Sequence, residues 1–544
     1  MFSEDSFIRR HKIITALGIV VVLIVLFFGS RMIGPHRFYK VDFIKVNADQ
    51  PAGVLQVGVA KRDITPDLAQ YDTYDDVDND NKYKPKEGWM SKIKMVAGND
   101  TYNDRNHNGK FDPVWIAGFG SNRPAKGVHD PIWARAIAFR NNGVTIAMVT
   151  LDAIGIFHDK FIDMRKMIDP NLKIDHVIFS SLHNHETPDT MGNWSGPIPT
   201  PWAFDHKNMD RIKKACKEAV EEAVRGLQPA DMYIVPITLE KPEDFVDDSR
   251  KPIVIDKTIC CARFTKHGAD ETIATMVSWG NHPETLGGSN PLITSDFCGY
   301  WRDGVENGVS NPGGVEGLGG MCLYFQGMVG GLMTQLHTTV PHRNGVDTYR
   351  EDSWEKAQAL GENLAILTVK GLRGPNVIKC ENPRVGIAAK TFYAPMSGLF
   401  KYAILLGLIH PGVFLTSEGI CARSEVNFAR VGDLDMLTVP GELYVEIGEG
   451  GVEAPAGQDF PIAPVEVPPL RQEMDGKVKM VIGLANDEIG YIIPKSQWDT
   501  KPPFAYGTKK GQYGEVNSGG PDVAPAVHRN SIDLIRRMKE AWPK

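Results

Sequence analysis

The pattern of apolar and polar positions predicts a chain in which strands and helices alternate. The run at 144–151 is almost wholly apolar, as a strand buried on both faces requires, and Asn141-Asn142-Gly143 before it is a hairpin turn. Together with this run, strand-length apolar segments occur at 54–59, 175–182, 259–264, 272–279, 384–390 and 478–484, and helical periodicity occurs at 159–168, 207–225, 351–370 and 531–541. No Pro- or Ser-rich linker follows residue 50, so we predict one large α/β (mixed α+β) domain.

One apolar run is much longer than a strand. The segment from Ile13 to Ser30 carries no charge and would be roughly 27 Å long as a helix, enough to cross a bilayer core. A cleaved secretory signal is the alternative, but no clear cleavage site follows, which favours an uncleaved anchor. Basic residues flank both ends and leave the orientation open. We predict a basic flank at 1–12, a transmembrane signal anchor at 13–30, a stem at 31–53 and a catalytic domain at 54–544.

Composition excludes several classes of protein. The 544 residues are 42% hydrophobic and 23% charged, so the chain can bury a sizeable core. A net charge of −7 provides no basic face for nucleic acid. The seven cysteines are irregularly spaced and contain no C-x-x-C pair, so the chain is neither a disulfide scaffold nor a zinc ribbon.

Residues 67–113 differ from the rest, being rich in Asp, Asn, Lys and Tyr, and we interpret them as an insertion. Counted from Asp76, oxygen-bearing side chains occupy positions one, three, five and twelve of an EF-hand-like loop; counted from Asp104, they occupy positions one, three, five and nine. The candidate calcium ligands are Asp76, Asp78, Asp80, Glu87, Asp104, Asn106, Asn108 and Asp112. A solvated acidic loop is the alternative. Extracellular Ca²⁺ would suit such loops and favours an exported domain.

Three apolar runs each end at residues able to bind a metal. His183 and His185 follow the run at 175–182, His282 follows 272–279, and Glu442 follows Leu437-Thr-Val. We predict that the first strand continues through His183 and His185, so that its alternation places both side chains on one side. Glu186 is an alternative general base, although it would then point the other way. Zinc hydrolases use His and carboxylate ligands with one position left for water, so the set favours a metallohydrolase.

In this order the motifs resemble the catalytic domain of the neutral/alkaline, non-lysosomal ceramidase family. The resemblance covers about residues 55 to 520. The matching stretches are Gly58–Pro66, Ala117–Gly120, Gly127–Ala136, Ser181–His185, Asn281–Pro283 with Ser295–Asp296, Val439–Glu442 and Gly490–Pro494.

The resemblance implies a Zn²⁺ ion and a set of site residues. The implied zinc ligands are His183, His282, Glu442 and Tyr491, and the implied catalytic or substrate contacts are His185, Arg250 and Tyr513. It also implies an N-acyl lipid or N-acyl amide substrate such as ceramide, cleaved to a fatty acid and an amine. In that chemistry the metal activates water, and His185, Arg250 or Tyr491 stabilises the oxyanion.

Two departures from the family are visible. Gly327 and Gly331 stand where the family has an active-site serine and an aspartate, and 544 residues leave no room for an immunoglobulin-like C-terminal domain. The implied zinc ligands are all present, so we still predict a zinc-dependent amide hydrolase. We predict that it is anchored in a membrane, with its catalytic domain on the extracytoplasmic side, in the periplasm or at the cell surface. The alternatives are a related metallohydrolase of another amide or ester, and a catalytically inactive calcium-binding surface protein.

A second apolar stretch, Tyr402 to Leu415, contains His410 and Pro411 and is short for a membrane span. It is interpreted either as a buried core segment or as an apolar lip that receives an acyl chain.

Overall fold

Two β-sheets form the centre of the computed structural model, which describes residues 34–86, 97–196, 204–331, 333–409 and 413–543, and residues 15, 18–27, 29 and 30. The nine-stranded sheet runs in the order β16 (Met321–Gln326), β12 (Thr272–Trp279), β11 (Thr258–Lys266), β9 (Gln228–Thr238), β2 (Leu55–Asp63), β6 (Trp133–Asn141), β7 (Val144–Leu151), β8 (His176–Ser181), with β20 (Ile378–Cys380) beside β9. The six-stranded sheet runs in the order β1 (Asp42–Lys45), β21 (Val385–Pro395), β23 (Gly419–Val431), β24 (Leu434–Thr438), β26 (Val478–Ile482), with β22 (Phe414–Thr416) beside β23.

The two sheets pack face to face over an apolar core. Phe139, Ile146 and Met276 of the larger sheet and Met436 and Ile482 of the smaller one belong to the same buried cluster. Successive strand side chains point to opposite faces, so the alternate residues of β7 must be covered from the other side. Every residue of β7 is buried, as its continuous apolar sequence predicts.

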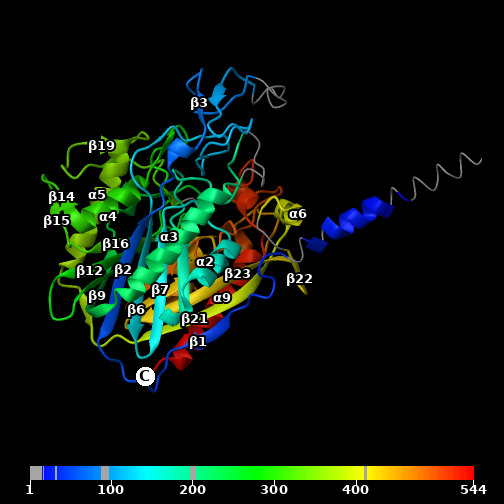
Figure 1. Cartoon of the computed structure of the whole chain (residues 1–544). Coiled ribbons are helices and arrows are strands. Elements are labelled where there is room, and N and C mark those ends of the chain that lie inside the picture. The colour runs from blue at the N-terminus through cyan, green and yellow to red at the C-terminus, as the bar shows by residue number, and fades with distance from the viewer. Residues whose placement is uncertain are drawn as a thin grey trace, which may run out of the picture.

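Helices cover the outer faces and complete a four-layer α/β/β/α arrangement (Figure 1). On the larger sheet, α2 (His158–Met167) and α3 (His206–Arg225) cover one half, and α4 (Asp296–Asn307) and α5 (Trp354–Leu372) cover the other. The smaller sheet is covered by α9 (Val523–Ala541). Ile212, Cys216 and Val220 form the buried face of α3, and the Asp205 side chain caps its first turn by accepting from Asn208 N.

Shorter elements surround these layers. They are β3 (Thr73–Asp75), β4 (Thr101–Asn103), β5 (Gly127–Val128), β10 (Asp247–Asp248), β13 (Leu292–Ile293), β14 (Gly308–Val309), β15 (Val315–Glu316), β17 (Met333–Thr334), β18 (Val340–Pro341), β19 (Thr348–Tyr349), α6 (Gly398–Leu406), β25 (Glu442–Leu443), α7 (Val445–Glu449), α8 (Leu470–Glu473) and β27 (Tyr491–Ile492). All the predicted strands and helices occur, whereas α4, β9 and β23 were not predicted.

The N-terminal segment projects away from the layers on the side that carries α6 (Figure 1). Residues 18–27 are helical, and the apolar side chains from Ile19 to Phe27 are exposed. Among the helices of the described residues, none combines the length and the hydropathy needed to cross a membrane. Part of the predicted anchor at 13–30 lies outside the described residues, so the anchor stays a prediction.

Candidate metal centre

The nine-stranded sheet supplies three histidines at the ends of two strands. The prediction that one strand continues through His183 and His185 is wrong. β8 ends at Ser181, where Ser181 N donates to Leu484 O of the other sheet's loop, and His183 then takes a left-handed φ of 61°. This turn, rather than strand alternation, brings the rings of His183 and His185 to 4.8 Å between centroids.

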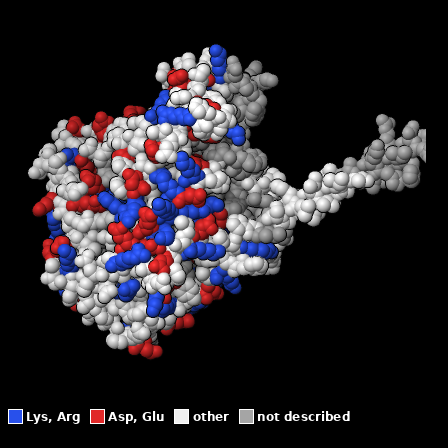
Figure 2. All heavy atoms as spheres, in the orientation of Figure 1, with Lys and Arg blue, Asp and Glu red and all other residues white. Residues whose placement is uncertain are grey.

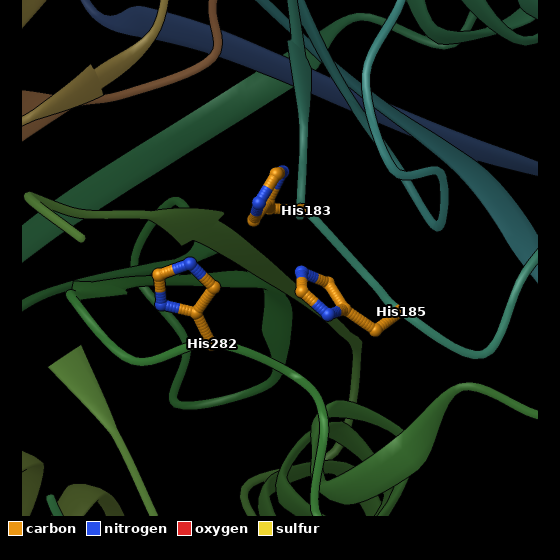
Figure 3. A group of neighbouring side chains, drawn as sticks. All are labelled: His183, His185 and His282. Carbon is orange, nitrogen blue, oxygen red and sulfur yellow. The ribbon is translucent and has the colours of Figure 1, made fainter. Parts of the chain in front are cut away.

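The third histidine, His282, comes from the segment after β12 and faces the other two. One ring nitrogen of each of His183, His185 and His282 lies within 4.8 Å of the others, and all three residues are buried. Figure 3 shows the three rings arranged around a common space, with His183 and His185 on one segment of the backbone and His282 on another. A cluster of this kind can hold a metal ion.

Hydrogen bonds to the backbone fix two of these rings. His183 Nδ1 lies 2.8 Å from Ile154 O, and His282 Nδ1 lies 2.8 Å from Met333 O. Each Nδ1–H therefore donates to a carbonyl, which leaves Nε2 as the free ring nitrogen. Metal-binding histidines are typically held in this way. The two Nε2 atoms lie 3.5 Å and 3.0 Å from the same oxygen, Glu442 Oε2.

The six-stranded sheet supplies the remaining predicted metal ligands. Glu442 in β25 lies opposite Tyr491 in β27 in a parallel pair, just beyond the ends of β24 and β26. Asn486 N donates to Phe179 O of the larger sheet at 2.7 Å, so the two sets of strand ends are joined directly. The structure thus brings His183, His282, Glu442 and Tyr491 into one place where the two sheets meet.

The pKa values of these residues show that His183 is ready to bind a cation, whereas His282 must first lose a proton. Burial lowers the pKa of His183 to about 3, so its ring is neutral, the form that binds a metal. Burial would also lower the pKa of His282, but the carboxylate of Glu442 outweighs it and raises the value to about 9. Burial and the charge of Glu442 raise the pKa of Tyr491 well above its usual value. Two imidazole nitrogens and a carboxylate are a donor set that fits a divalent transition metal.

Sequence reasoning did not assign Glu284, which lies beside His185. Its Oε2 is 3.2 Å from His185 Nδ1, and its Oε1 accepts from the Thr334 hydroxyl. Burial raises the pKa of a carboxyl, but the His185 contact outweighs burial and lowers that of Glu284 to about 2. An acid two residues after His282, in His282-Pro283-Glu284, was the available signal.

Glu186, the alternative general base, is bound to Arg123 and Asn290 rather than to the histidines. Its carboxylate is buried and lies 2.8 Å from Arg123 Nη2 and 2.9 Å from Asn290 Nδ2. Burial raises the pKa of Glu186 well above its usual value despite that arginine. The residue therefore ties the segment after His185 to neighbouring loops and is not held toward the histidines.

Arg250 and Tyr513 belong to a supporting loop at the side of the centre. Arg250 is buried and binds both oxygens of Glu515 at 2.8 Å and 2.9 Å, and its Nη1 also donates to Tyr513 O at 2.6 Å. The guanidinium thus fixes the loop that carries Tyr513, whose ring centroid is 6.1 Å from that of Tyr491. Direct contact of Arg250 or Tyr513 with a substrate stays a prediction.

A cavity of about 650 Å³ opens beside the histidines. One side is polar and includes His183, His185, Glu442, Tyr491 and Tyr513, while Phe400, Ala403, Ile404 and Leu408 of the α6 region line the apolar side. Of the α6 residues only Ile404 is buried, and Gly407 with a φ of 74° ends the helix. The interpretation of this stretch as a core segment is therefore wrong for α6. His410 and Pro411 lie outside the described residues.

Gly327 stands where the family resemblance implies a serine, and the backbone around it is closely packed. A Cβ at Gly327 would lie 2.5 Å from Gly280 N, and a Cβ at Gly280 would lie 2.1 Å from Met328 O. The ends of β12 and β16 thus approach too closely for any side chain. A serine at position 327 would require the backbone of Gly280 to shift.

The predicted calcium loops form a lobe above the layers (Figure 1), and lysines contact the acids of the first loop. Asp76, Asp78 and Asp80 are close enough to hold a metal ion together. Lys126 Nζ lies 2.7 Å from Asp76, and Lys84 Nζ lies 2.7 Å from Asp78 and 2.5 Å from Asp80. Glu87 lies outside the described residues.

In the second loop, the candidate ligands bond to one another and to the backbone. Asp104 accepts from Asn108 N and Gly109 N, Asn106 accepts from Asn108 N, and Asn108 Nδ2 donates to Asp112 at 2.7 Å. Calcium binding by either loop stays a prediction.

Comparison with known proteins identifies one group of relatives. No protein-family model matches the sequence. The chain is similar to neutral ceramidase B of Dictyostelium discoideum, with 24% identity over an alignment of 206 positions. The match covers 34% of this chain and 28% of the relative. The chain thus matches less than a third of that relative's length.

Solved structures share the fold. The neutral ceramidase of Pseudomonas aeruginosa superimposes with a TM-score of 0.58 at 15% identity, covering 90% of this chain and 75% of the other. A ceramidase complexed with C2 gives the same TM-score and identity and is covered to 76%. The resemblance to the neutral ceramidase family is therefore confirmed in sequence similarity and in fold.

Proposed function

We propose that the chain is a zinc-dependent hydrolase that cleaves the amide bond of an N-acyl lipid such as ceramide. One observation carries the proposal: the Nε2 atoms of His183 and His282 converge on Glu442 in a cavity whose opposite side is apolar. The relatives with this fold are ceramidases, one of them in complex with C2. A cavity with one polar and one apolar side fits an amide attached to a long chain.

His183, His282 and Glu442 would hold the ion, with Tyr491 beside them. A zinc ion held by these residues would lower the pKa of water to about 7 and polarise the amide carbonyl. His185 faces the same space, and a Glu284 carboxylate oxygen lies 3.2 Å from its Nδ1. That contact leaves His185 Nε2 to exchange a proton with the leaving amine nitrogen. Tyr491 supplies a hydroxyl for the oxyanion.

The other side of the cavity positions the acyl chain. Phe400, Ala403 and Ile404 present apolar surface from α6, and Met191 and Trp194 continue the cavity wall. Packing the acyl chain of the substrate against these residues excludes water from the part of the cavity near the histidines, and this strengthens the electrostatic contacts there. Tyr513, on the loop fixed by Arg250, lies where the polar head of a substrate would be.

A second candidate function follows from Gly327. Because the implied serine is replaced and the backbone leaves no room for it, the reaction must depend on the metal centre and His185. Such a centre also suits another amide or an ester. An inactive calcium-binding protein is the remaining alternative, and metal content together with turnover separates it from both hydrolases.

The test is metal analysis of the purified chain combined with a substrate screen. We expect about one zinc per chain and faster release of fatty acid from N-acylsphingosine than from short N-acyl amides. His183→Ala and His282→Ala should lose both metal and turnover. His337→Ala, whose side chain is 57% exposed, is the matched control and should keep both. Unchanged turnover without metal would reject the zinc mechanism.

We also propose that residues 13–30 anchor the chain and that the catalytic domain lies on the extracytoplasmic side, in the periplasm or at the cell surface. Support comes from the uncharged run and from the seven cysteines, all buried and free, which leave no accessible thiol to oxidise after export. Protease added to intact cells or to spheroplasts should degrade the domain. Full protection in both would reject this location.

A further inference from the structure

The helix α6 separates the cavity from an apolar outer surface. Phe400, Ala403 and Ile404 line the cavity. Leu399, at the mouth, lines it and is also exposed, whereas Tyr402, three residues further along, and Leu406, four residues after that, lie on the outside. Their exposed fractions are 83%, 59% and 52%. Leu415 is exposed as well, and Leu408 and Val516 are exposed where they line the mouth of the cavity. These three residues, with Leu399, Tyr402 and Leu406, are called the α6 face. A contiguous exposed apolar patch at the mouth of a cavity is a sign of an interaction site.

The N-terminal segment joins the domain beside this face. Arg423 donates to the carbonyls of His36 and Pro35, and the guanidinium of Arg37 lies 5.9 Å from the centre of the Phe414 ring in β22. The apolar helix at 18–27 therefore leaves the domain next to β22 and the α6 face, as Figure 1 shows. Phe38, in the same turn, is 94% exposed.

Charge is distributed to match a lipid surface. Figure 2 shows Lys, Arg, Asp and Glu side chains gathered over α2 and α3 and thinning out toward the N-terminal helix. Within α6 the charged residue is Lys401, and Arg37 and Lys40 are exposed in the turn beside β22. Basic residues at the rim of an apolar face bind lipid phosphates while the apolar side chains enter the bilayer.

We infer that the α6 face inserts into the surface of a lipid bilayer, so that the cavity opens onto the leaflet and the substrate enters past α6 without crossing water. The membrane is chosen as the occupant because the face is continuous with the origin of the apolar helix at 18–27. This inference rests on the proposed lipid substrate. It adds the orientation of the domain and the route of the substrate.

The direct test labels a cysteine introduced on the α6 face. All seven native cysteines are buried, so a cysteine introduced at the surface is labelled alone. We would label Leu406→Cys with a polarity-sensitive fluorophore in the full chain, reconstituted in nanodiscs that contain doxyl lipids. The control is Val346→Cys, which is 82% exposed in the loop between β18 and β19. We expect a blue shift and several-fold stronger quenching at residue 406 than at residue 346.

Equal quenching at the two positions would overturn the inference. A blue shift that grows with protein concentration, without lipid quenching, would also overturn it and would indicate a second copy of the chain on this face.

A functional test uses Tyr402→Ser with Leu406→Ser, because neither side chain lines the cavity. We expect turnover of an N-acyl lipid in vesicles to fall about tenfold and hydrolysis of a short soluble amide to stay within about twofold. Equal losses on both substrates, with an unchanged melting temperature, would contradict the inference. If the unmodified chain cleaves neither substrate, the proposed function fails, while the quenching result still decides the orientation.

Discussion

The three-histidine centre and the acidic lobe at 67–113 are both predicted metal sites, and they are built in opposite ways. In the centre, buried rings are fixed by carbonyls, and one carboxylate faces two free nitrogens. In the lobe, Asp78 is half exposed, and Lys84 lies against it and Asp80. A cation entering the centre would displace a proton, whereas one entering the lobe must also displace a lysine.

Ligand spacing in a sequence specifies the groups that can bind a cation, but not the charged side chains that compete for them. Lys84 and Lys126 are ordinary surface residues in the sequence, and only the fold places their ammonium groups on the candidate calcium ligands. In the centre, the positive charge close to the carboxylate comes from His282, which would lose it on binding a metal. Competition for the carboxylates, more than their number, distinguishes the two regions.

One matched substitution in each region tests whether the functional metal binds in the centre or in the lobe. Glu442→Gln should abolish metal binding and lower turnover more than about a hundredfold, since even groups that only orient ligand rings contribute 10–100-fold. Asp78→Asn in the lobe should leave bound zinc and turnover within about twofold. Metal analysis and product release measure both. A large loss from Asp78→Asn would place the functional metal in the lobe.

Glu284→Gln tests the role of His185 within the centre. The amide keeps the shape but removes the charge that holds the His185 ring, so we expect turnover to fall about 10–100-fold while zinc stays bound. Metal content, kcat and KM are measured together, and a similar loss from His185→Ala identifies the shared role. Loss of zinc from His185→Ala would instead make His185 a metal ligand.

Gly327→Ser tests whether the serine that the family resemblance implies at this position can be restored. Its Cβ would meet the backbone of Gly280, so we expect the free energy of unfolding to fall by about 1–3 kcal/mol with no gain in turnover. Urea unfolding measures the change. Gly53→Ser is the control, because its nearest neighbour, Asn141 Oδ1, is at 3.9 Å. Full stability together with faster turnover would show that β12 and β16 can move apart.

Removing the lysines of the lobe should leave its carboxylates without a competing ammonium group, as in the centre. Lys84→Met with Lys126→Met frees the carboxylates of the first loop, so we expect Ca²⁺ to bind about tenfold more tightly than in the unmodified chain. Isothermal titration with Ca²⁺ measures this change, and turnover should not change. If both proteins bind Ca²⁺ equally well, the lysines do not compete with it.

The smallest expected effect concerns a buried acid near the centre. Burial raises the pKa of Glu446 to about 7, against an ordinary value of 4.5. Because the folded-state pKa lies above the unfolded one, the group's contribution to stability is present below about pH 4.5 and is lost as the pH rises to about 7. Glu446→Gln should flatten the fall in melting temperature over this range by roughly 2 °C. Parallel curves for both proteins would contradict this.

Much of the layered fold could be predicted because its strands are short apolar runs bounded by turns. The run at 144–151 and the hairpin before it appear as predicted. α6 was harder, because Gly398–Leu406 is apolar on both sides of the helix and its periodicity cannot distinguish a cavity wall from core.

The predicted metal ligands were identified from strand ends and from the family resemblance, and the structure brings them together. Glu284 was not identified because its contact with His185 depends on how two distant loops meet. The course of the chain at His183 was mispredicted for a similar reason: a hydrogen bond from Ser181 to the other sheet ends the strand early. Contacts between the sheets are not encoded in the periodicity of either one.

The position of the centre between the two sheets links metal supply to the lifetime of the protein. Its ligands come from both sheets, so they assemble only in the native state, and a bound ion stabilises that state by mass action. Partial unfolding that parts the sheets must release the ion. In a cell short of metal, the chain would spend more time open to proteases and its abundance would fall. The amount of enzyme, as well as its turnover, would then report the available metal.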